Sequence, residues 1–167
     1  MSRFIILLAA LGVVGVAGAQ LPVEPHPDQH AMLESDDAQL AANKQLVYDF
    51  WRHALVARDM DAARQYMHED YMQHNPNIPT GRAPFIAFFG QMEQRPVQDT
   101  IDGLVAIVAE DDLVTMSFVR ECQDPRNPGQ TYTTTWFDMF RVTDGMITEH
   151  WDYGTVTGDD NPSDCAN

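Results

Sequence analysis

The chain has 167 residues, of which 44% are hydrophobic, and its formal net charge at pH 7 is −15. This length is typical of a single domain that buries a core without needing a structural metal. Nucleic acids and anionic membranes require cationic surfaces, so the acidic composition predicts that neither is a partner of the mature protein.

The N-terminal segment 1–19 has the form of a secretory signal peptide. Arg3 precedes an apolar run over residues 4–16, and the small residues 17–19 supply a cleavage signal. The run is interrupted by glycine and is shorter than the roughly 20 apolar residues that a membrane span needs. We therefore predict export to the periplasm or secretion; an uncleaved membrane anchor is the alternative.

Residues 20–36 are rich in proline and polar side chains, which predicts a flexible leader. A single domain is expected over residues 37–160, followed by a C-terminal tail over residues 161–167. No internal repeat and no second domain is expected.

Three helices are expected in the first half of the domain. Apolar residues at three- and four-residue spacing predict a helix over about 37–58, and a second helix over 61–67 has Asp59 as its N-cap. Segment 68–82 contains two prolines, two asparagines and a glycine, and it is expected to be a loop. A third helix is expected over about 83–94, burying the apolar residues Phe85, Ile86, Phe88 and Phe89.

After Pro96 the apolar pattern changes to that of β-strands, with strands expected over 100–110, 113–122, 131–142 and 146–156. The Thr143-Asp144-Gly145 turn predicts a hairpin in which residues 142 and 146 face each other. Helices followed by an antiparallel sheet indicate an α+β fold. Because the strands are apolar on both faces, the second face must contact a partner subunit or belong to a curved sheet around a pocket.

The last strand carries ionisable residues on both of its faces. Successive strand residues point to opposite sides, so His150 and Asp152 share one face, whereas Glu149 and Trp151 share the other. If the His150 face is buried, two groups that are costly to desolvate enter the core, and a functional site would explain them.

The predicted hairpin register places Asp138 opposite His150 and Trp136 opposite Asp152. A carboxylate beside an imidazole forms a proton-transfer pair, and a carboxylate against an indole loses hydration, which disfavours its charged form. The alternative is a solvated strand face with an incidental ion pair. His74, in the expected loop, could be directed into the same cavity from its rim.

Two stretches, YMQHNPNIPTGRAPFIAFF and FDMFRVTDGMITEHWD, closely resemble the SnoaL-like polyketide cyclase family of the nuclear transport factor 2-like superfamily. The resemblance covers about residues 43–153. It implies a cone, in which a curved antiparallel sheet wraps around the N-terminal helices and encloses a pocket. It also implies a dimer contact on the outer face of the sheet, where Trp151 would lie.

The cyclases of that family close a ring by intramolecular aldol condensation without a metal or an organic cofactor. Asp152 matches their acid/base aspartate, Asp138 matches a second polar position, and His74 and His150 match pocket positions. The catalytic set implied by the resemblance is therefore Asp152, Asp138, His150 and His74. The expected substrate contacts are Trp136, Phe140, Asn75 and Tyr71.

These residues support a cofactor-free enzyme that performs acid–base chemistry on a small carbonyl compound, as a cyclase, an isomerase or an aldol catalyst. The first alternative is a non-catalytic, periplasmic small-ligand-binding domain of the same fold. A second alternative is a metal enzyme in which His74, His150 and a carboxylate are the ligands.

The exported part contains two cysteines, and the second lies close to the end of the chain. An exported chain with this arrangement predicts a disulfide that fixes the C-terminal tail, although two free thiols are the alternative. We expect the mature protein to begin at or near Gln20 and to carry a Cys122–Cys165 bridge. Intact-mass measurement of periplasmic material checks both points; retention of residues 1–19, or two alkylatable thiols without reductant, would contradict them.

Overall fold

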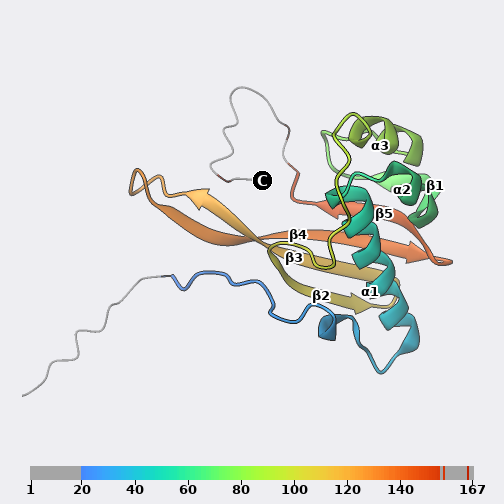
Figure 1. Cartoon of the computed structure of the whole chain (residues 1–167), viewed down its shortest axis with the longest axis horizontal. Coiled ribbons are helices and arrows are strands. Elements are labelled where there is room, and N and C mark those ends of the chain that lie inside the picture. The colour runs from blue at the N-terminus through green and yellow to red at the C-terminus, as the bar shows by residue number, and fades with distance from the viewer. Residues whose placement is uncertain (1–19, 155, 157–164, 166–167) are drawn as a thin grey trace, which may run out of the picture.

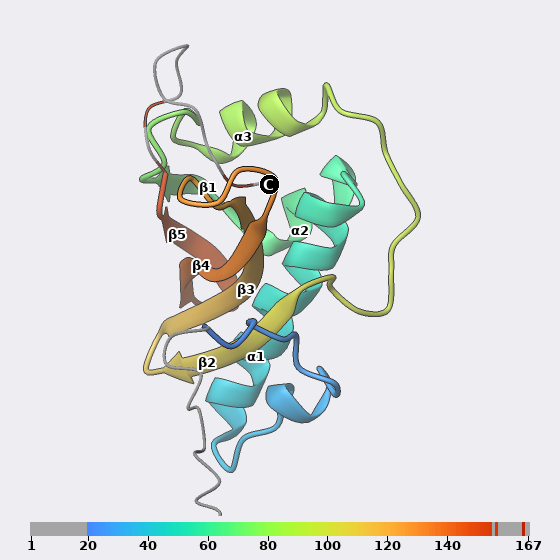
Figure 2. The same ribbon diagram turned by 90° about the vertical axis from the view of Figure 1, so that its left-hand side faces the viewer.

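The computed structural model describes residues 20–154, 156 and 165, so the predicted signal peptide lies outside the described residues. A five-stranded sheet is built in the order β1-β5-β4-β3-β2, and the helices lie against one of its faces (Figures 1 and 2). The strands are β1 (Met67–Gln73), β2 (Leu104–Glu110), β3 (Leu113–Gln123), β4 (Thr131–Thr143) and β5 (Met146–Asp152). The α+β class is confirmed, and the curved sheet does not close into a barrel.

The helices begin where the sequence predicts. Helix α1 (Ala38–Phe50) is capped by Asp37, whose carboxylate accepts hydrogen bonds from two backbone N–H groups, and it continues as a π-helix over Trp51–Val56. Asp59 caps α2 (Met60–Tyr66). Helix α3 (Arg82–Phe89) ends before residue 94, at Gly90, and the expectation that Phe88 is buried is wrong because 37% of this residue is exposed.

Segment 67–73 forms a strand where a loop was expected. Strand β1 pairs in parallel with β5, at the edge of an otherwise antiparallel sheet. Met67 and Tyr71 are buried, whereas residues 68–70 are polar and exposed, so the apolar alternation that identifies a strand is weak. Pairing with β5 decides the conformation here, as is common for strand segments with a weak pattern.

The segment over residues 20–36 packs against the domain, and the expectation of a flexible leader is corrected. The Gln29 side chain is buried: its Nε2 donates to the Ile101 carbonyl at 2.7 Å, and its Oε1 accepts from the Ile101 N–H at 2.8 Å. The Tyr48 hydroxyl donates to the same Oε1 at 2.9 Å. Leu33 joins the hydrophobic core. The polar composition of this segment therefore does not indicate that its Gln29 amide satisfies buried backbone groups.

The β4–β5 turn is tighter than predicted. Thr143 lies opposite Met146, so only Asp144 and Gly145 form the turn. Both residues have positive φ angles, of 51° and 74°. This is the conformation that an Asp-Gly pair adopts in a two-residue hairpin.

Thr148 is an extra residue in β5. Its neighbours Ile147 and Glu149 lie opposite two consecutive residues of β4, which leaves Thr148 without an opposite residue and makes a β-bulge. On a regular strand Ile147 and His150 would point to opposite faces. The bulge turns both inward, with exposed fractions of 0% and 6%.

The tighter turn and the bulge together shift the predicted register by two residues. Asp138 lies opposite Asp152, and Phe140 lies opposite His150, which corrects the expected pairs of Asp138 with His150 and Trp136 with Asp152. Because a shift of two preserves the inward and outward faces, the same side chains still point to the interior.

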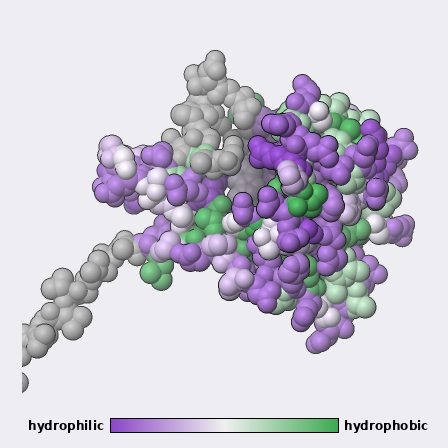
Figure 3. Space-filling view, in the orientation of Figure 1, coloured by the Kyte–Doolittle hydropathy of each residue, from purple (hydrophilic) through white to green (hydrophobic). Residues whose placement is uncertain are grey.

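The core fills the space between the helices and the inner sheet face. Phe50 is central to it, with its ring 5.9 Å from that of Phe85 and 5.8 Å from that of Phe140. The surface visible in Figure 3 is mostly hydrophilic, with small hydrophobic areas between. Within the described residues, no helix has the length and apolar character needed to cross a membrane.

Strands β3 and β4 extend beyond their neighbours as a two-stranded arm (Figure 1), because β2 and β5 pair with them only at the other end. The arm carries Cys122, which is joined to Cys165 by a disulfide, as expected from the sequence. The bridge joins two residues that lie 43 positions apart in the sequence.

Candidate active site

A cavity of about 520 Å³ lies between the inner sheet face and the helices. Its wall is largely aromatic, and polar side chains from β1, β4 and β5 face it. This combination of an apolar wall and a few converging polar groups is typical of a small-molecule site. The aromatic lining includes Phe50, Trp51, Phe85, Phe118, Trp136 and Phe140.

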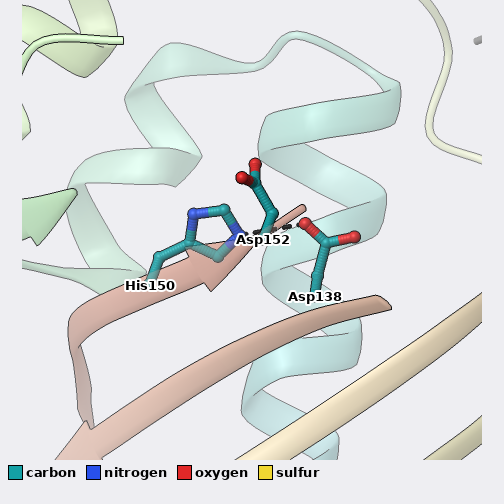
Figure 4. A group of neighbouring side chains, drawn as sticks. All are labelled: Asp138, His150 and Asp152. Carbon is teal, nitrogen blue, oxygen red and sulfur yellow. Dashed lines mark hydrogen bonds and ion pairs between the residues drawn. The ribbon is translucent and has the colours of Figure 1, made fainter. Parts of the chain in front are cut away.

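Asp138 from β4 and His150 and Asp152 from β5 converge in this cavity (Figure 4). His150 Nε2 lies 3.0 Å from Asp138 Oδ1, and both residues are buried. Asp152 is half-buried. The predicted proximity of Asp138 and His150 therefore holds in spite of the corrected register, because the two side chains meet diagonally across the ladder.

Gln73 fixes the protonation of the His150 ring. The Asn75 backbone N–H donates to Gln73 Oε1 at 3.0 Å, which identifies that atom as the amide oxygen. The same oxygen lies 2.8 Å from His150 Nδ1, so Nδ1 must carry a hydrogen and donate it. The hydrogen bond between Nε2 and Asp138 Oδ1 then requires one further proton, held on one of these two atoms.

The environment of Asp138 favours retention of that proton. Burial raises the pKa of Asp138, the hydrogen bond and charge of His150 lower it, and the nearby Asp152 raises it; the net direction is upward. A hydrogen bond from the Trp136 side chain also lowers the pKa of Asp138, but within the described residues no donor reaches its buried Oδ2 with good hydrogen-bond geometry. An unsatisfied buried oxygen is costly, and a ligand in the cavity could supply the missing partner.

Both oxygens of Asp152 are held in place. Asn75 Nδ2 donates to Oδ2 at 2.7 Å, and the Gly154 N–H donates to Oδ1 at 2.8 Å. A Cβ atom at Gly154 would lie 2.7 Å from the Asn75 side chain and 2.8 Å from Asp152 Oδ1, so this close approach requires glycine. The carboxylate is thereby fixed at the cavity wall.

The four expected substrate contacts all line the cavity: Tyr71, Asn75, Trp136 and Phe140. Gln73 Nε2 donates to the Tyr71 hydroxyl at 3.1 Å. Burial, followed by the charges of Asp152 and Asp138, raises the pKa of Tyr71, so its hydroxyl stays protonated. The Phe140 ring stacks on His150 with 4.6 Å between ring centroids.

His74 does not reach the cavity, and its predicted place in the pocket is wrong. Its backbone N–H bonds to the His150 carbonyl at 3.1 Å, which continues the β1–β5 ladder. Strand alternation then sends Gln73 inward and His74 outward. On the outer face His74 stacks on Trp151 at 5.2 Å and contacts Glu149 at 2.8 Å. Both partners lie on the outer side of β5, as predicted.

Sequence reasoning missed Gln73 and Arg58, which both line the cavity. Gln73 lies two residues after Tyr71, so recognising β1 as a strand would have placed both on one face. Arg58 follows the first helical segment, and nothing in the apolar pattern indicates where its side chain lies.

The same three residues could hold a metal ion. Asp138, His150 and Asp152 each offer a ligand atom, and these atoms lie within 4.8 Å of one another. Gln73 leaves His150 Nε2 as the nitrogen available to a cation, an arrangement found around metal-bound histidines. The set foreseen from the sequence, which included His74, is not brought together.

Residues 47–150, more than half of the chain, match the model of the SnoaL-like domain. The chain belongs to the SnoaL-like domain family. This makes it a small-molecule-binding or catalytic domain. None of the curated proteins matches the chain.

Solved structures of the SnoaL-like fold resemble the chain. A Jannaschia protein named as a SnoaL-like polyketide cyclase has a TM-score of 0.51 at 18% identity, covering 72% of this chain and 90% of its own. A protein of Acidithiobacillus ferrooxidans named as a polyketide cyclase has a TM-score of 0.50 at 17% identity. The match covers 71% of this chain and 89% of that protein. A protein of Xanthomonas campestris, also named as a polyketide cyclase, is 25% identical and has a TM-score of 0.48. The match covers 71% of this chain and 93% of that protein. The likeness to the Jannaschia and Acidithiobacillus structures shows that the chain has the nuclear transport factor 2-like fold.

The arrangement around Gln73 predicts a measurable tautomer. Gln73→Met keeps the side-chain length but removes the acceptor of the His150 Nδ1 hydrogen, so we expect the free energy of unfolding to fall by about 1–3 kcal/mol. Imidazole ¹⁵N NMR should show a protonated Nδ1 in the wild type and a loss of that preference in the variant. Gln45→Met, at an exposed position on α1, should change neither. A deprotonated Nδ1 in the wild type would refute the assignment.

Proposed function

We propose that this SnoaL-like protein is a cofactor-independent enzyme that moves protons on a small carbonyl compound, in an aldol condensation, cyclisation or isomerisation. The observation that carries the proposal is the buried hydrogen bond between His150 and Asp138, beside the fixed carboxylate of Asp152. A proton donor and a proton acceptor thus face one apolar cavity. Side chains with these properties are the usual means of general acid–base catalysis.

Asp152 and the His150–Asp138 pair have separate roles in the proposed reaction. Asp152 accepts the proton from the carbon next to the carbonyl, and its oxygens are oriented by Asn75 and Gly154. The His150–Asp138 pair donates its proton to the carbonyl oxygen, which gives an enol. As the enol hydroxyl returns its proton to the pair, the nucleophilic carbon either attacks a second carbonyl, whose oxygen takes the proton from Asp152, or is itself reprotonated by Asp152. The pair thus polarises the carbonyl, a role that His74 cannot take from the outer face of the sheet.

The cavity favours this chemistry because most of its lining is apolar. The aromatic wall lowers the local dielectric and strengthens hydrogen bonds to a developing enolate oxygen. The raised pKa of Asp138 favours retention of a proton on this carboxyl group. A non-catalytic ligand-binding domain would use the same apolar wall but would not depend on the charge of Asp152.

Asp152→Asn preserves the shape of the side chain but removes the proton acceptor. We expect unchanged ligand binding and a turnover lower by about 10²–10⁴-fold, the usual size of a general acid–base contribution. The ligand is to be identified by native mass spectrometry of the exported protein, and turnover measured on that compound. Glu149→Gln, on the outer face of the same strand, should leave turnover nearly unchanged. Equal activity of both variants and the wild type would exclude Asp152 from catalysis.

We further propose that the exported protein is a homodimer formed through the outer face of the sheet. Large apolar side chains remain on this face: Met72 is 48% exposed, Val108 60% and Phe137 54%. Met139 and Trp151 lie between them as an outward-facing cross-strand pair. Exposed apolar side chains gathered on one sheet face are typical of a protein–protein contact.

Phe137→Glu should convert this dimer to a monomer. The substitution places a charge among the apolar side chains of the contact, where its desolvation is costly. Sedimentation at micromolar concentration should show a dimer for the wild type and a monomer for the variant. Phe88→Glu, which alters a partly exposed phenylalanine on α3, should leave the dimer intact. A wild type that sediments only as a monomer would disprove the proposal.

A further inference from the structure

Arg58 contributes a positive charge to the cavity from its helical side. It follows the π-helix over Trp51–Val56, and it lines the same cavity as Trp51 and Leu55. The reacting side chains Asp138, His150 and Asp152 come from the sheet. A ligand in this cavity therefore meets an arginine as well as the proposed acid–base groups.

The backbone at Arg58 is in a conformation that favours glycine. Its φ angle is 60°, and the residue directly follows the helix C-cap Ala57. Helices that end in this left-handed conformation usually have glycine there, and another residue costs about 1–2 kcal/mol. The chain nevertheless carries a long, charged side chain at this position, and local folding does not explain it.

The Arg58 guanidinium has no hydrogen-bond acceptor or ion-pair partner within the described chain. Its carbon lies 5.1 Å from the centre of the Phe89 ring, which orients the side chain but does not neutralise its charge. Burial and the neighbouring positive charge of Arg95 lower the pKa of Arg58. Other arginines differ, because protein oxygens accept hydrogen bonds from Arg52, Arg82, Arg126 and Arg141.

A second guanidinium lines the cavity from the sheet. Arg120 on β3 lies over Trp136, with 4.4 Å from its guanidinium carbon to the ring centre. Trp136 precedes Asp138 by two residues on β4, a distance of roughly 7 Å along a strand. Two positive charges thus border the cavity in a chain whose net charge is −15.

We propose that the ligand is a small carbonyl compound that also carries a carboxylate, and that Arg58 is the specificity residue that binds this carboxylate. A planar guanidinium donates two parallel hydrogen bonds to a carboxylate, which suits a fixed orientation. The aromatic wall between the sheet and the helices accommodates the apolar part of such a molecule. The inference that the ligand has a carbonyl group rests on the proposed function. The inference that it has a carboxylate rests on Arg58 alone.

The test compares para-acetylcinnamate with its methyl ester, which lacks the negative charge and carries one added methyl group. Binding of each to the mature, disulfide-bonded protein is titrated by calorimetry. We expect the wild type to bind the carboxylate at least tenfold more tightly than the ester. Arg58→Met, which keeps the apolar stem, should remove most of this preference by weakening carboxylate binding alone.

Two further variants keep the test interpretable. Arg64→Met removes the same charge from an exposed position on α2 and should keep the preference, which controls for net charge. Arg58→Gly should also lose the preference while its melting temperature stays equal or rises, because glycine suits the backbone there. An ester bound as tightly as the carboxylate, a preference that survives in Arg58→Met, or binding of neither compound would overturn the inference.

Catalysis is measured separately, by NMR of hydrogen–deuterium exchange at the acetyl methyl group in D₂O. Exchange that depends on Asp152 supports the proposed acid–base function whatever the outcome at Arg58. A carboxylate preference that depends on Arg58, without exchange, supports the anion site and counts against the enzyme. The two proposals can therefore fail independently.

Discussion

The β-bulge at Thr148 is the constraint on which the site depends. Without it, the inward position of Ile147 would turn His150 and Asp152 to the outer face of the sheet. With it, one short strand contributes a core residue near the turn and two ionisable residues further along. Bulges next to functional sites commonly redirect a side chain in this way. The parallel pairing of β1 then brings Gln73 to His150 and so determines which ring nitrogen carries a hydrogen.

The sequence was most informative where one local interaction decides the structure. Asp37 and Asp59 were predictable as helix caps because the capping bonds involve residues two or three positions away. The inward direction of His150 and Asp152 was also predictable, although by a register that was wrong by two residues. The inward and outward faces were still predicted correctly because the tighter turn and the bulge each shift the register by one residue. A total shift of two residues preserves the faces.

The failures share a physical cause, which is that distant partners override weak local patterns. Strand β1 has few apolar residues and exists because β5 pairs with it. The leader packs because the Gln29 amide matches the backbone of Ile101, a residue far away in the sequence. His74 was misplaced as a consequence of the first failure, since its direction follows from the alternation of β1.

The cavity contains two features that folding alone does not explain. Within the described residues no donor reaches the buried Asp138 Oδ2 with good hydrogen-bond geometry, and Arg58 combines an unfavourable φ angle with a charge that no described side chain neutralises. Each costs on the order of 1–3 kcal/mol, an appreciable share of a domain's stability of about 5–15 kcal/mol. A ligand that forms a hydrogen bond with Asp138 and offers an anion to Arg58 would satisfy both. Because one group lies on the sheet and the other on the helical wall, such a ligand would be held at two points, with its reactive carbon presented to Asp152.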